Sequence, residues 1–474
     1  MKLNKLLKGI KVLNAKEIKN VNIDNISNKT TSSFPNGLYV CLKGSSYDGH
    51  NFKDDAKQKG AVCFLVEEYD PYFDGMQILV KDTRKALSII AKNFYGPKFP
   101  KIIGITGTNG KTTTTNMVAH ILKTAGKKVG LIGTEGVFFN DKKINLHMTT
   151  PDPIDLFKLL KDMYDAKIEY AVMEVSAHAI YLEKIAALDF KIKALTNITE
   201  DHLDFFKTFE NYEETKSNFV KSGKSIKVVN IDDKYGCRIA NEAKRVYTYS
   251  MLLPSDATAS KITGDSSSFD LLLNGKNQLV KTNLIGDYNI QNSLCAILIC
   301  NKLKIKTNII IKGLNTFKSV DGRLNVFKND DKIAVLDFAH TPDALNKVLT
   351  TLKKVTKGKL YCLFGCGGNR DAQKRPLMGE IASKLCDYVF VTSDNPRFEE
   401  PEFIANQIVS GIKSTNYEII LDREEAIKKA TSLLNKDDLL AICGKGAEDY
   451  LEVKGIKYPY SDKNVLESLN FVKN

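Results

Sequence analysis

The sequence lacks long apolar runs. Nowhere in its 474 residues do apolar residues continue for the roughly 18 positions that a membrane-spanning helix needs. The basic first residues, 1–8, are likewise not followed by the apolar stretch of a secretion signal. We therefore expect no membrane partner and a cytoplasmic location.

Cysteine pairs in the C-x-x-C spacing are also absent. The nine cysteines are an odd number, are scattered along the chain and stand mostly within apolar runs. This distribution predicts reduced thiols in the core.

Motifs of nucleic-acid-binding proteins are missing, although the formal net charge is +13. There is no zinc finger, basic arm or aromatic-glycine RNA motif, and the lysines are interleaved with acidic residues throughout. A solvated, lysine-rich surface explains the charge better than a nucleic-acid partner does, and it also favours small anionic substrates.

Internal repeats and low-complexity tracts are absent, so the length predicts several ordinary domains. Short apolar runs occupy the first part of the chain, and prolines at 97 and 100 interrupt it there. Beyond that point strand-like runs alternate with helical patterns, which predicts mostly parallel sheets. We expect an α/β protein with a small N-terminal α/β domain at 1–97, a central parallel-sheet ATPase domain at 98–322 and a Rossmann-like, doubly wound domain at 323–474. The expected strands are 37–42, 61–66, 77–80, 102–105, 128–132, 170–175, 194–196, 227–229, 333–336, 360–364, 388–392, 418–421 and 439–442, with a helix at 83–94.

A glycine-rich turn follows the expected strand at 102–105 and precedes a helical pattern. Glycines let the backbone turn with several N–H groups pointing inward, and a helix start adds partial positive charge, so this segment predicts a phosphate-binding loop. Its lysine would reach the terminal phosphates of ATP, and the next threonine would bind Mg²⁺. The predicted nucleotide site is Gly107, Thr108, Asn109, Gly110, Lys111, Thr112 and Thr113.

The spacing of this loop is G-T-N-G-K-T and not the common G-x-x-x-x-G-K-[ST]. A glycine turn before an ordinary helix is the alternative, but glycine-lysine-threonine after a buried strand makes it less favoured.

Two further segments place polar side chains at strand ends. Glu174 stands inside an apolar strand, where an acid needs a metal or a cation as partner, so we favour a magnesium ligand over a surface acid. His202 lies in T-N-I-T-E-D-H-L-D at 196–204, which by itself is equally typical of a helix N-cap box.

These segments together resemble the muramyl (Mur) ligase family. The resemblance rests on G-T-N-G-K-T-T, T-T-P-D-P at 149–153, E-V-S-A-H at 174–178, T-N-I-T-E-D-H-L-D, G-D-Y-N-I-Q-N at 286–292, D-G-R at 321–323 and D-F-A-H-T-P-D at 337–343, and it extends over almost the whole chain. D-N-P-R at 394–397 resembles the motif that selects the amino acid in the meso-diaminopimelate-adding members.

The resemblance implies an ATP-dependent amide ligase of peptidoglycan synthesis. ATP would phosphorylate a glutamate carboxylate of UDP-N-acetylmuramoyl-L-alanyl-D-glutamate, and the amine of meso-diaminopimelate would attack the acyl phosphate. The implied catalytic residues are Lys111, Glu174, His202 and Lys216. The implied metal ligands are Thr112 and Glu174 for one magnesium, and His202 with a carbamylated Lys216 for a second. Carbamylation would turn the lysine into an anion that suits a hard cation.

Other implied roles concern the substrates. For the UDP-linked substrate the matching positions are Thr149, Thr150, Ser176, Lys184 and, in a poorly matching N-terminal segment, Ser27. Two positions depart from the family pattern: Lys184 replaces a usual arginine, and Leu182 replaces a usual glutamine. For diaminopimelate they are Arg370, Asp394, Asn395, Pro396, Arg397, Gly444 and Glu448, with Ala447 in place of a usual histidine. Positions implied to meet the nucleotide or link domains are Asn289, Asn292, Arg323, Asp337 and His340.

Two alternatives stay open at this point. One is an L-lysine-adding version of the same ligase, and the other is a nucleotide-binding regulator or scaffold that performs no ligation. The expected cofactors are ATP and Mg²⁺, the expected partners are small molecules, and a monomer is the default.

Overall fold

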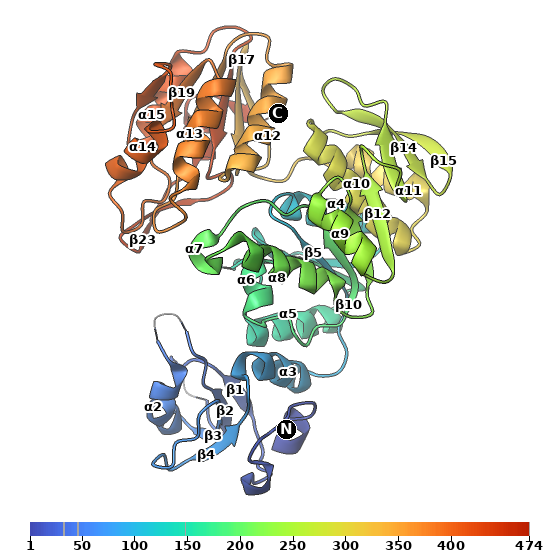
Figure 1. Ribbon diagram of the computed structural model, residues 1–474, viewed down its shortest axis with the longest axis vertical. Helices are drawn as coiled ribbons and strands as arrows, with labels where there is room; N and C mark the ends of the chain where they lie inside the picture. The colour runs from blue at the N-terminus through green and yellow to red at the C-terminus, as the bar shows by residue number, and fades with distance from the viewer. Residues whose placement is uncertain (32–33, 45–46, 147, 474) are drawn as a thin grey trace. The chain divides into compact units, whose positions relative to one another are not determined.

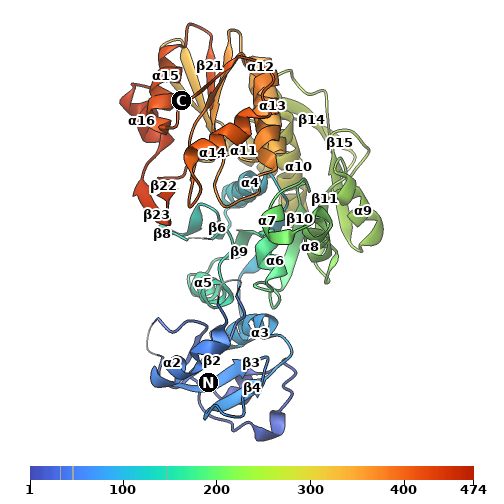
Figure 2. The same cartoon turned by 60° about the vertical axis from the view of Figure 1, so that its left-hand side comes forward.

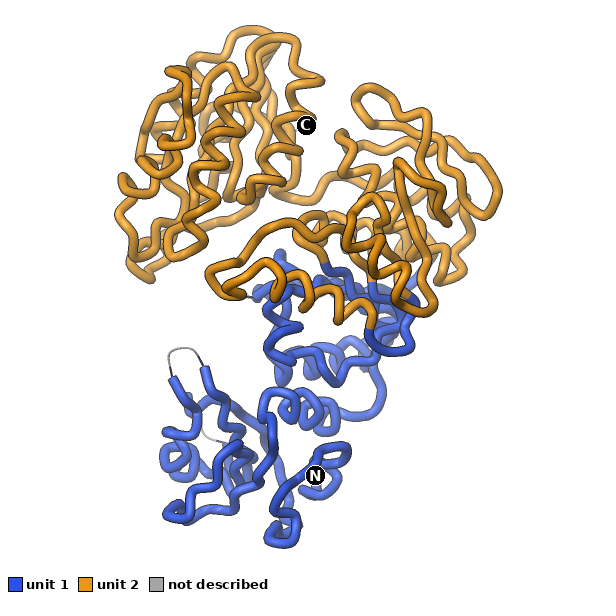
Figure 3. Tube along the Cα trace, viewed as in Figure 1, with its two compact units in different colours: residues 1–106, 126–193, 222–226 blue, residues 107–125, 194–221, 227–474 orange. Residues whose placement is uncertain are grey.

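A computed structural model describes residues 1–31, 34–44, 47–146 and 148–473 (Figure 1). Its backbone contacts divide the chain into two compact units (Figure 3). Unit 1 comprises residues 1–106, 126–193 and 222–226, and unit 2 comprises residues 107–125, 194–221 and 227–474. The predicted domain boundaries at 97/98 and 322/323 stay a prediction.

Unit 1 begins with a four-stranded parallel sheet in the order β1-β2-β3-β4. The expected strands at 37–42, 61–66 and 77–80 and the helix at 83–94 are confirmed within one or two residues, except that β2 ends at Val40. The helix α3 starts at an Asp82 cap, whose carboxylate accepts a hydrogen bond from the Lys85 amide. The elements are α1 (Leu3–Leu6), η1 (Ala15–Glu17), β1 (Asn25–Ser27), β2 (Gly37–Val40), η2 (Gly49–Phe52), α2 (Lys53–Gln58), β3 (Ala61–Val66), β4 (Met76–Leu79) and α3 (Thr83–Tyr95).

The second sheet portion of unit 1 has the order β5-β9-β6-β7-β8. The first three strands are parallel and almost wholly buried, as expected for apolar runs covered on both faces, and the last two are antiparallel. The register pairs Glu174 with Ile105, so both strands end at the same edge. The elements are β5 (Lys101–Thr106), β6 (Val129–Gly133), β7 (Gly136–Phe139), β8 (Lys142–Ile144), α5 (Pro153–Asp165), β9 (Tyr170–Glu174) and α6 (Ala177–Tyr181).

Unit 2 contains helix α4 (Lys111–Thr124), which continues the glycine turn and packs against α10 and α11. Strands β11, β12 and β13 are parallel, whereas β13, β14 and β15 form an antiparallel meander that the alternating pattern did not predict. Strand β10 (Phe190–Leu195) is divided between the units after residue 193. The other elements are α7 (Leu203–Phe206), α8 (Phe209–Lys221), β11 (Ile226–Asn230), α9 (Lys234–Glu242), β12 (Val246–Ser250), β13 (Ala257–Ser260), β14 (Ser268–Leu273), β15 (Lys276–Lys281), α10 (Asp287–Lys302) and α11 (Thr307–Thr316).

The last part of unit 2 is the doubly wound sheet that the sequence predicts. Its strand order is β20-β19-β18-β21-β17-β16-β24. The five strands from β20 to β17 in this order are parallel, and β16 and β24 add two antiparallel pairings at one edge. Helices α12, α13 and α14 share one core with alternate strand residues, and α15 and α16 share a second core with the others, so the helices cover both faces (Figures 1 and 2). The elements are β16 (Asn325–Asn329), β17 (Lys332–Asp337), α12 (Pro342–Val355), β18 (Leu360–Phe364), α13 (Lys374–Leu385), β19 (Tyr388–Val391), α14 (Pro401–Val409), β20 (Tyr417–Ile419), α15 (Arg423–Ser432), β21 (Leu439–Cys443), β22 (Tyr450–Val453), β23 (Ile456–Pro459), α16 (Asp462–Ser468) and β24 (Val472–Lys473).

A fully buried ion pair fixes two strand ends of this sheet. Two nitrogens of the Arg423 guanidinium donate to the Asp462 carboxylate, Nε to Oδ1 at 2.8 Å and Nη2 to Oδ2 at 2.7 Å. The same guanidinium donates to the Ser393 carbonyl after β19 and to the Cys443 carbonyl at the end of β21. These are the strand ends from which D-N-P-R and the segment 444–448 continue.

We predict that Asp462→Asn lowers the free energy of unfolding by about 3–5 kcal/mol, because it leaves the buried Arg423 charge without a counter-ion. The measurement is a denaturant titration. The control is Glu467→Gln on the same helix, whose ion pair with Lys463 is half exposed at 3.7 Å and should matter by less than about 1 kcal/mol. Equal stability losses in the two variants would contradict the assigned role.

No helix within the described ranges combines the length and the apolar character that crossing a membrane requires.

Candidate functional site

The loop between β5 and α4 needs its two glycines. Gly107 has φ +148° and Gly110 has φ +85°, both in the region that favours glycine. A Cβ atom at Gly107 would lie 1.9 Å from the Thr196 hydroxyl, and one at Gly110 would lie 2.3 Å from the Asn292 amide oxygen. The loop therefore combines the backbone form of a phosphate cradle with the start of a helix, as the sequence predicts.

Two lysines meet at one oxygen of this loop. The Lys111 ammonium donates to the Gly107 and Thr108 carbonyls, each at 2.8 Å, and the Lys216 amine donates to the same Gly107 carbonyl at 2.7 Å. The polar side chains of Thr112 and Thr113, in the first turn of α4, are buried beside them. Lys111 and Lys216, predicted from separate motifs, are thus brought together.

Lys216 is a buried titratable group with a strongly shifted pKa. Its side chain is 1% exposed, and its amine lies 4.8 Å from the centre of the Tyr212 ring. Burial, and next the nearby Lys111 charge, lower the pKa of Lys216 well below its ordinary value. The shift makes the neutral amine, the form that reacts with carbon dioxide, easier to reach than in an ordinary lysine.

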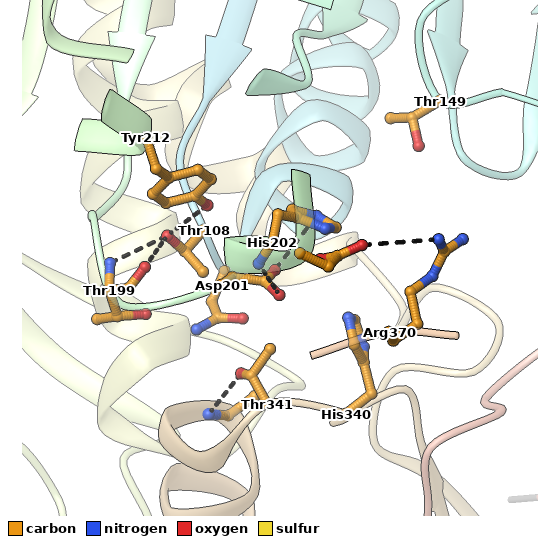
Figure 4. Close-up of polar contacts among 12 residues, drawn as sticks. Thr108, Thr149, Thr199, Asp201, His202, Tyr212, His340, Thr341 and Arg370 are labelled. Atoms are coloured by element: carbon orange, nitrogen blue, oxygen red, sulfur yellow. Dashed lines mark hydrogen bonds and ion pairs between the residues drawn. The ribbon is translucent and has the colours of Figure 1, made fainter. Parts of the chain in front are cut away.

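Thr108 ties the loop to the segment around His202 (Figure 4). Its hydroxyl donates to the Thr199 carbonyl, accepts from the Thr199 amide and lies 3.0 Å from the Tyr212 hydroxyl. Asn109 is held in turn by the Asn197 side-chain oxygen and donates to Asp343 at 2.8 Å. Thr108 and Asn109 therefore position the loop through their side chains.

His202 adopts the left-handed conformation, with φ +57°, directly before α7. Among the described residues no side chain caps α7, so the structure does not contain the N-cap box that was the alternative for this segment. The ring Nε2 lies 3.3 Å from the Asp201 carboxylate (Figure 4). Burial would raise the pKa of Asp201, but His202, His340 and Lys374 lower it below its ordinary value.

Asn289 and Asn292, the two predicted asparagines of α10, are buried against the loop helix. The Asn292 oxygen accepts from the Thr114 hydroxyl at 3.2 Å, and its amide donates to the Asn289 oxygen at 3.1 Å. Arg323 donates to the Thr112 hydroxyl at 3.3 Å and stacks 4.5 Å above the Phe338 ring. All three residues therefore support the start of α4.

The predicted residues of unit 1 form a separate group at the end of β9. The Glu174 side chain is 1% exposed, and its carboxylate accepts from the Thr134 amide and hydroxyl at 3.0 and 3.2 Å. The Thr150 hydroxyl donates to the Glu174 carbonyl and accepts from the Ser176 amide. Thr149 lies 3.1 Å from the Thr134 hydroxyl. These polar groups therefore gather around one strand end.

Lys184 and Ser27 stand apart from that cluster in their contacts. Lys184 pairs with Asp152 at 2.7 Å, directly before α5. The Ser27 hydroxyl, on β1 in the first sheet, exchanges two hydrogen bonds with the Lys29 backbone. The Ser176 hydroxyl caps α6 by accepting from the Ala179 amide.

A pocket of about 170 Å³, lined mainly by charged and polar residues, lies within unit 2. It collects six of the predicted acceptor residues and both predicted histidines, although their positions in the sequence lie up to 246 residues apart (448 minus 202). Its lining is Asp201, His202, Asp204, Phe338, His340, Gly365, Cys366, Gly367, Arg370, Asp371, Lys374, Asp394, Asn395, Arg397, Gly444 and Glu448. Pro396 is the predicted selector residue that does not line it.

Lys374 is a pocket residue that our sequence analysis missed. It is the first residue of α13, and its ammonium donates to the His340 carbonyl at 2.9 Å. Its position four residues after Arg370 could have pointed to the pocket. That signal is weak, because lysine is a common surface residue.

The buried Asn395 side chain links two charged residues, Lys445 and Glu448, at the pocket. The Asn395 oxygen accepts from the Lys445 ammonium at 3.1 Å, and its amide nitrogen donates to Glu448 at 2.9 Å. Lys445 is fully buried and also reaches Glu448 at 3.2 Å. Burial raises the pKa of Glu448, and Lys445 opposes that shift. Asn395 and Lys445 thereby fix one carboxylate oxygen of Glu448.

The two predicted arginines differ in how firmly they are held. Arg397 donates through Nη1 to the Gly368 carbonyl at 2.8 Å and through Nε to Glu452 at 3.2 Å. Arg370 is half exposed and reaches Asp204 only at 4.0 Å (Figure 4). The loop that carries Arg370 is anchored by the buried Arg375, which donates to the Gly367 carbonyl and pairs with Glu399.

Asp337 is the last residue of β17, and His340 follows it and lines the pocket. The buried Asp337 carboxylate accepts from the Leu324 and Ala339 amides, and burial raises its pKa against the effect of Arg323. The His340 Nδ1 lies 2.8 Å from the Phe338 carbonyl. Burial, and next the Lys374 charge, lower the pKa of His340 to about 4.

This pKa shift predicts a loss of stability in mild acid. The unfolded chain binds a proton at this histidine below a pH of about 6.5, and the folded chain does so only near pH 4, so the free energy of unfolding falls as the pH drops between them. We therefore expect the free energy of unfolding of His340→Gln to fall by about 1–2 kcal/mol less between pH 7 and pH 5 than that of the unchanged protein. Denaturant titrations at the two pH values measure this difference. The same loss in both proteins would contradict a neutral His340.

Three Mur ligase family descriptions match the chain: the Mur ligase family catalytic domain at 17–95, the Mur ligase middle domain at 105–300 and the Mur ligase glutamate ligase domain at 322–446. The chain belongs to the Mur ligase family.

Two curated relatives match this chain over nearly its full length. UDP-N-acetylmuramoyl-L-alanyl-D-glutamate--2,6-diaminopimelate ligase 1 of Clostridium acetobutylicum is 43% identical over 100% of this chain and 99% of that one. The ligase of the same name, without the number, from Aquifex aeolicus is 39% identical over 98% of this chain and 94% of that one.

Solved structures agree with the fold. A structure of a UDP-N-acetylmuramoyl-L-alanyl-D-glutamate--2,6-diaminopimelate ligase superposes with a TM-score of 0.68 at 27% identity, covering 97% of this chain and 98% of that one. MurF ligase from Thermotoga maritima, solved in complex with ADP, reaches a TM-score of 0.64 at 21% identity over 88% of this chain and 93% of that one. The α/β class and the three-domain Mur ligase architecture are thereby confirmed.

Proposed function

We propose that this protein is the ATP-dependent ligase that joins meso-diaminopimelate to UDP-N-acetylmuramoyl-L-alanyl-D-glutamate in peptidoglycan synthesis. The observation that carries the acceptor is the pocket of unit 2, which presents the Arg370 and Arg397 guanidiniums together with the Glu448 carboxylate. Two guanidiniums suit a carboxylate, and a carboxylate suits an ammonium. The distal end of diaminopimelate offers both groups.

The first step is phosphoryl transfer from ATP to a glutamate carboxylate of the UDP-linked substrate, which gives ADP and an acyl phosphate. Two anions must approach each other, so positive charge has to surround the phosphates. The loop amides, the start of α4 and Lys111 supply it, after Lys111 exchanges the two loop carbonyls for phosphate oxygens.

The second step is attack of the diaminopimelate amine on the acyl carbon. The amide bond forms, phosphate leaves with the former carboxylate oxygen, and the ammonium loses its protons to the surroundings. The pocket residues hold the distal end, so the reacting amine is positioned rather than free to diffuse.

Thr112, Glu174, His202 and Lys216 are the residues we assign to magnesium. The donor chemistry fits: Thr112 offers a hydroxyl at the loop, Glu174 ends the strand whose register places it beside Ile105, and the neutral Lys216 amine can become a carbamate. Bound there, Mg²⁺ would neutralise phosphate charge. Among the described residues no three His, Cys, Asp or Glu side chains form a metal site, so the assignment depends on these mixed ligands.

The UDP-linked substrate is assigned to unit 1. Thr149, Thr150 and Ser176 offer hydroxyl groups at the end of β9, Lys184 offers positive charge, and Ser27 is the weakest assignment because its hydroxyl bonds within its own turn. A cytoplasmic location and a monomeric state stay predictions.

The alternatives are less well supported. L-Lysine has no distal carboxylate, so an L-lysine-adding enzyme does not account for Arg397 in the pocket. A binder without catalysis does not account for a fully buried lysine beside the phosphate loop whose pKa is lowered by burial and by Lys111.

An isotope experiment tests the acyl phosphate. The UDP-linked substrate is prepared with ¹⁸O in both carboxylates of its glutamate, and the phosphate released with magnesium, ATP and diaminopimelate is analysed by mass spectrometry. One ¹⁸O atom per phosphate is expected. Amide formation with unlabelled phosphate would contradict the mechanism.

A further inference from the structure

The hairpin β22–β23 is joined to the D-N-P-R segment by backbone hydrogen bonds. The Arg397 amide donates to the Glu452 carbonyl at 3.0 Å, and the Lys454 amide donates to the Arg397 carbonyl at 2.7 Å. The Glu452 amide also donates to the Asn395 side-chain oxygen at 2.9 Å. The two segments therefore form one structural piece, although 55 residues separate Arg397 from Glu452.

Arg397 has an uncommon backbone conformation inside this piece. Its φ is +53°, the left-handed region that a long side chain rarely adopts. Such a conformation persists where surrounding contacts impose it, and here the two hairpin hydrogen bonds do so. The direction in which the Arg397 side chain leaves the backbone is thus set by the hairpin.

The guanidinium itself is oriented by two acceptors. Nε donates to the Glu452 carboxylate at 3.2 Å, and Nη1 donates to the Gly368 carbonyl at 2.8 Å. Within the described ranges Nη2 has no hydrogen-bond partner. Arg397 lines the pocket, whereas Glu452 does not. Glu452 takes the Nε proton and the Gly368 carbonyl takes an Nη1 proton, so Nη2 is the donor left for a carboxylate in the pocket.

We propose that Glu452 is a positioning residue for acceptor selection: it turns the Nη2 side of Arg397 toward the distal carboxylate of the incoming amino acid. This rests on the proposed function. Glu452 acts through Arg397 and touches no substrate, so its loss should affect only acceptors that carry a distal carboxylate.

The test is a double-mutant cycle on the Michaelis constant for diaminopimelate. Glu452→Ala should raise KM about tenfold with little change in kcat or in KM for ATP, because the binding orientation and not the chemistry is altered. In an Arg397→Ala background the same change should have no further effect, since the group that it positions is gone. Glu452→Gln, which keeps an oxygen acceptor for Nε, should restore most of the affinity.

Lys457→Ala is the matched control. Lys457 is the cross-strand partner of Glu452 in the same hairpin and stacks on Tyr450, so its removal perturbs the hairpin without touching Arg397. Its KM for diaminopimelate should stay unchanged.

The outcomes separate the two proposals. If the unchanged protein forms no amide with any acceptor, the proposed function is wrong. If it uses diaminopimelate and Glu452→Ala leaves KM unchanged, lowers it, or raises it equally in the Arg397→Ala background, the positioning role of Glu452 is overturned while the function stands.

Discussion

Replacing Lys216 with methionine should lower kcat by about 10²–10³-fold, the cost of losing one electrostatic element of a phosphoryl-transfer site. The reason lies in its surroundings: a fully buried amine shares the Gly107 carbonyl with Lys111, and burial with that neighbouring charge lowers its pKa well below the ordinary value. A neutral amine combines with carbon dioxide to give a carbamate and one proton. Methionine fills similar space but cannot form that anion.

Carbon-13 NMR gives this prediction a readout besides activity. Protein equilibrated with ¹³C-bicarbonate should show one carbamate resonance that disappears in Lys216→Met. Lys227→Met is the matched control, because Lys227 is also buried and burial also lowers its pKa. A resonance that survives in Lys216→Met, or a kcat within a few-fold of the unchanged protein, would contradict the assignment.

The second large effect is expected from Arg397→Ala, which should lower kcat/KM for diaminopimelate by about 30- to 1000-fold. This range corresponds to about 2–4 kcal/mol for truncating one partner of a hydrogen-bonded, partly buried charge pair. The loss should appear mainly in KM, since the guanidinium binds the end of the acceptor far from the reacting amine.

Steady-state kinetics with two acceptors check it. L-Lysine, tested at high concentration, should be used equally poorly by both proteins because it has no distal carboxylate. Arg375→Ala is not a suitable control, because its guanidinium anchors the loop of Arg370. Lys428→Ala, which removes a half-exposed basic side chain of α15 outside the pocket, should behave as the unchanged protein. Equal loss with both acceptors would point to misfolding of the pocket instead.

Local signals made much of this molecule predictable. The strand before Gly107 and the helix after it depend on neighbours in the sequence, and the structure has β5 and α4 there. The strands at 360–364 and 439–442 were equally clear, because apolar runs covered on both faces leave little ambiguity. The resemblance assigned Arg370, Arg397 and Glu448 to one substrate, and the structure brings them into one pocket because each follows a parallel strand and the three strand ends meet at one edge.

Contacts between distant segments escaped the sequence analysis. Lys445 is a lysine between two glycines, the pattern of an exposed turn, yet it is fully buried by Asn395 and Glu448. Glu452 carries no motif, and its role depends on a hairpin that meets residue 397 through hydrogen bonds. The left-handed backbone at His202 and Arg397 is likewise imposed from outside the local sequence.

Phosphate release by the purified protein tests the central claim most directly. With magnesium, ATP and UDP-N-acetylmuramoyl-L-alanyl-D-glutamate, the assay compares meso-diaminopimelate, L-lysine and no acceptor, and mass spectrometry identifies the product. We predict rapid release only with diaminopimelate, together with a product heavier by one diaminopimelate residue. Release that follows L-lysine instead, or no acceptor-dependent release at all, would contradict the account.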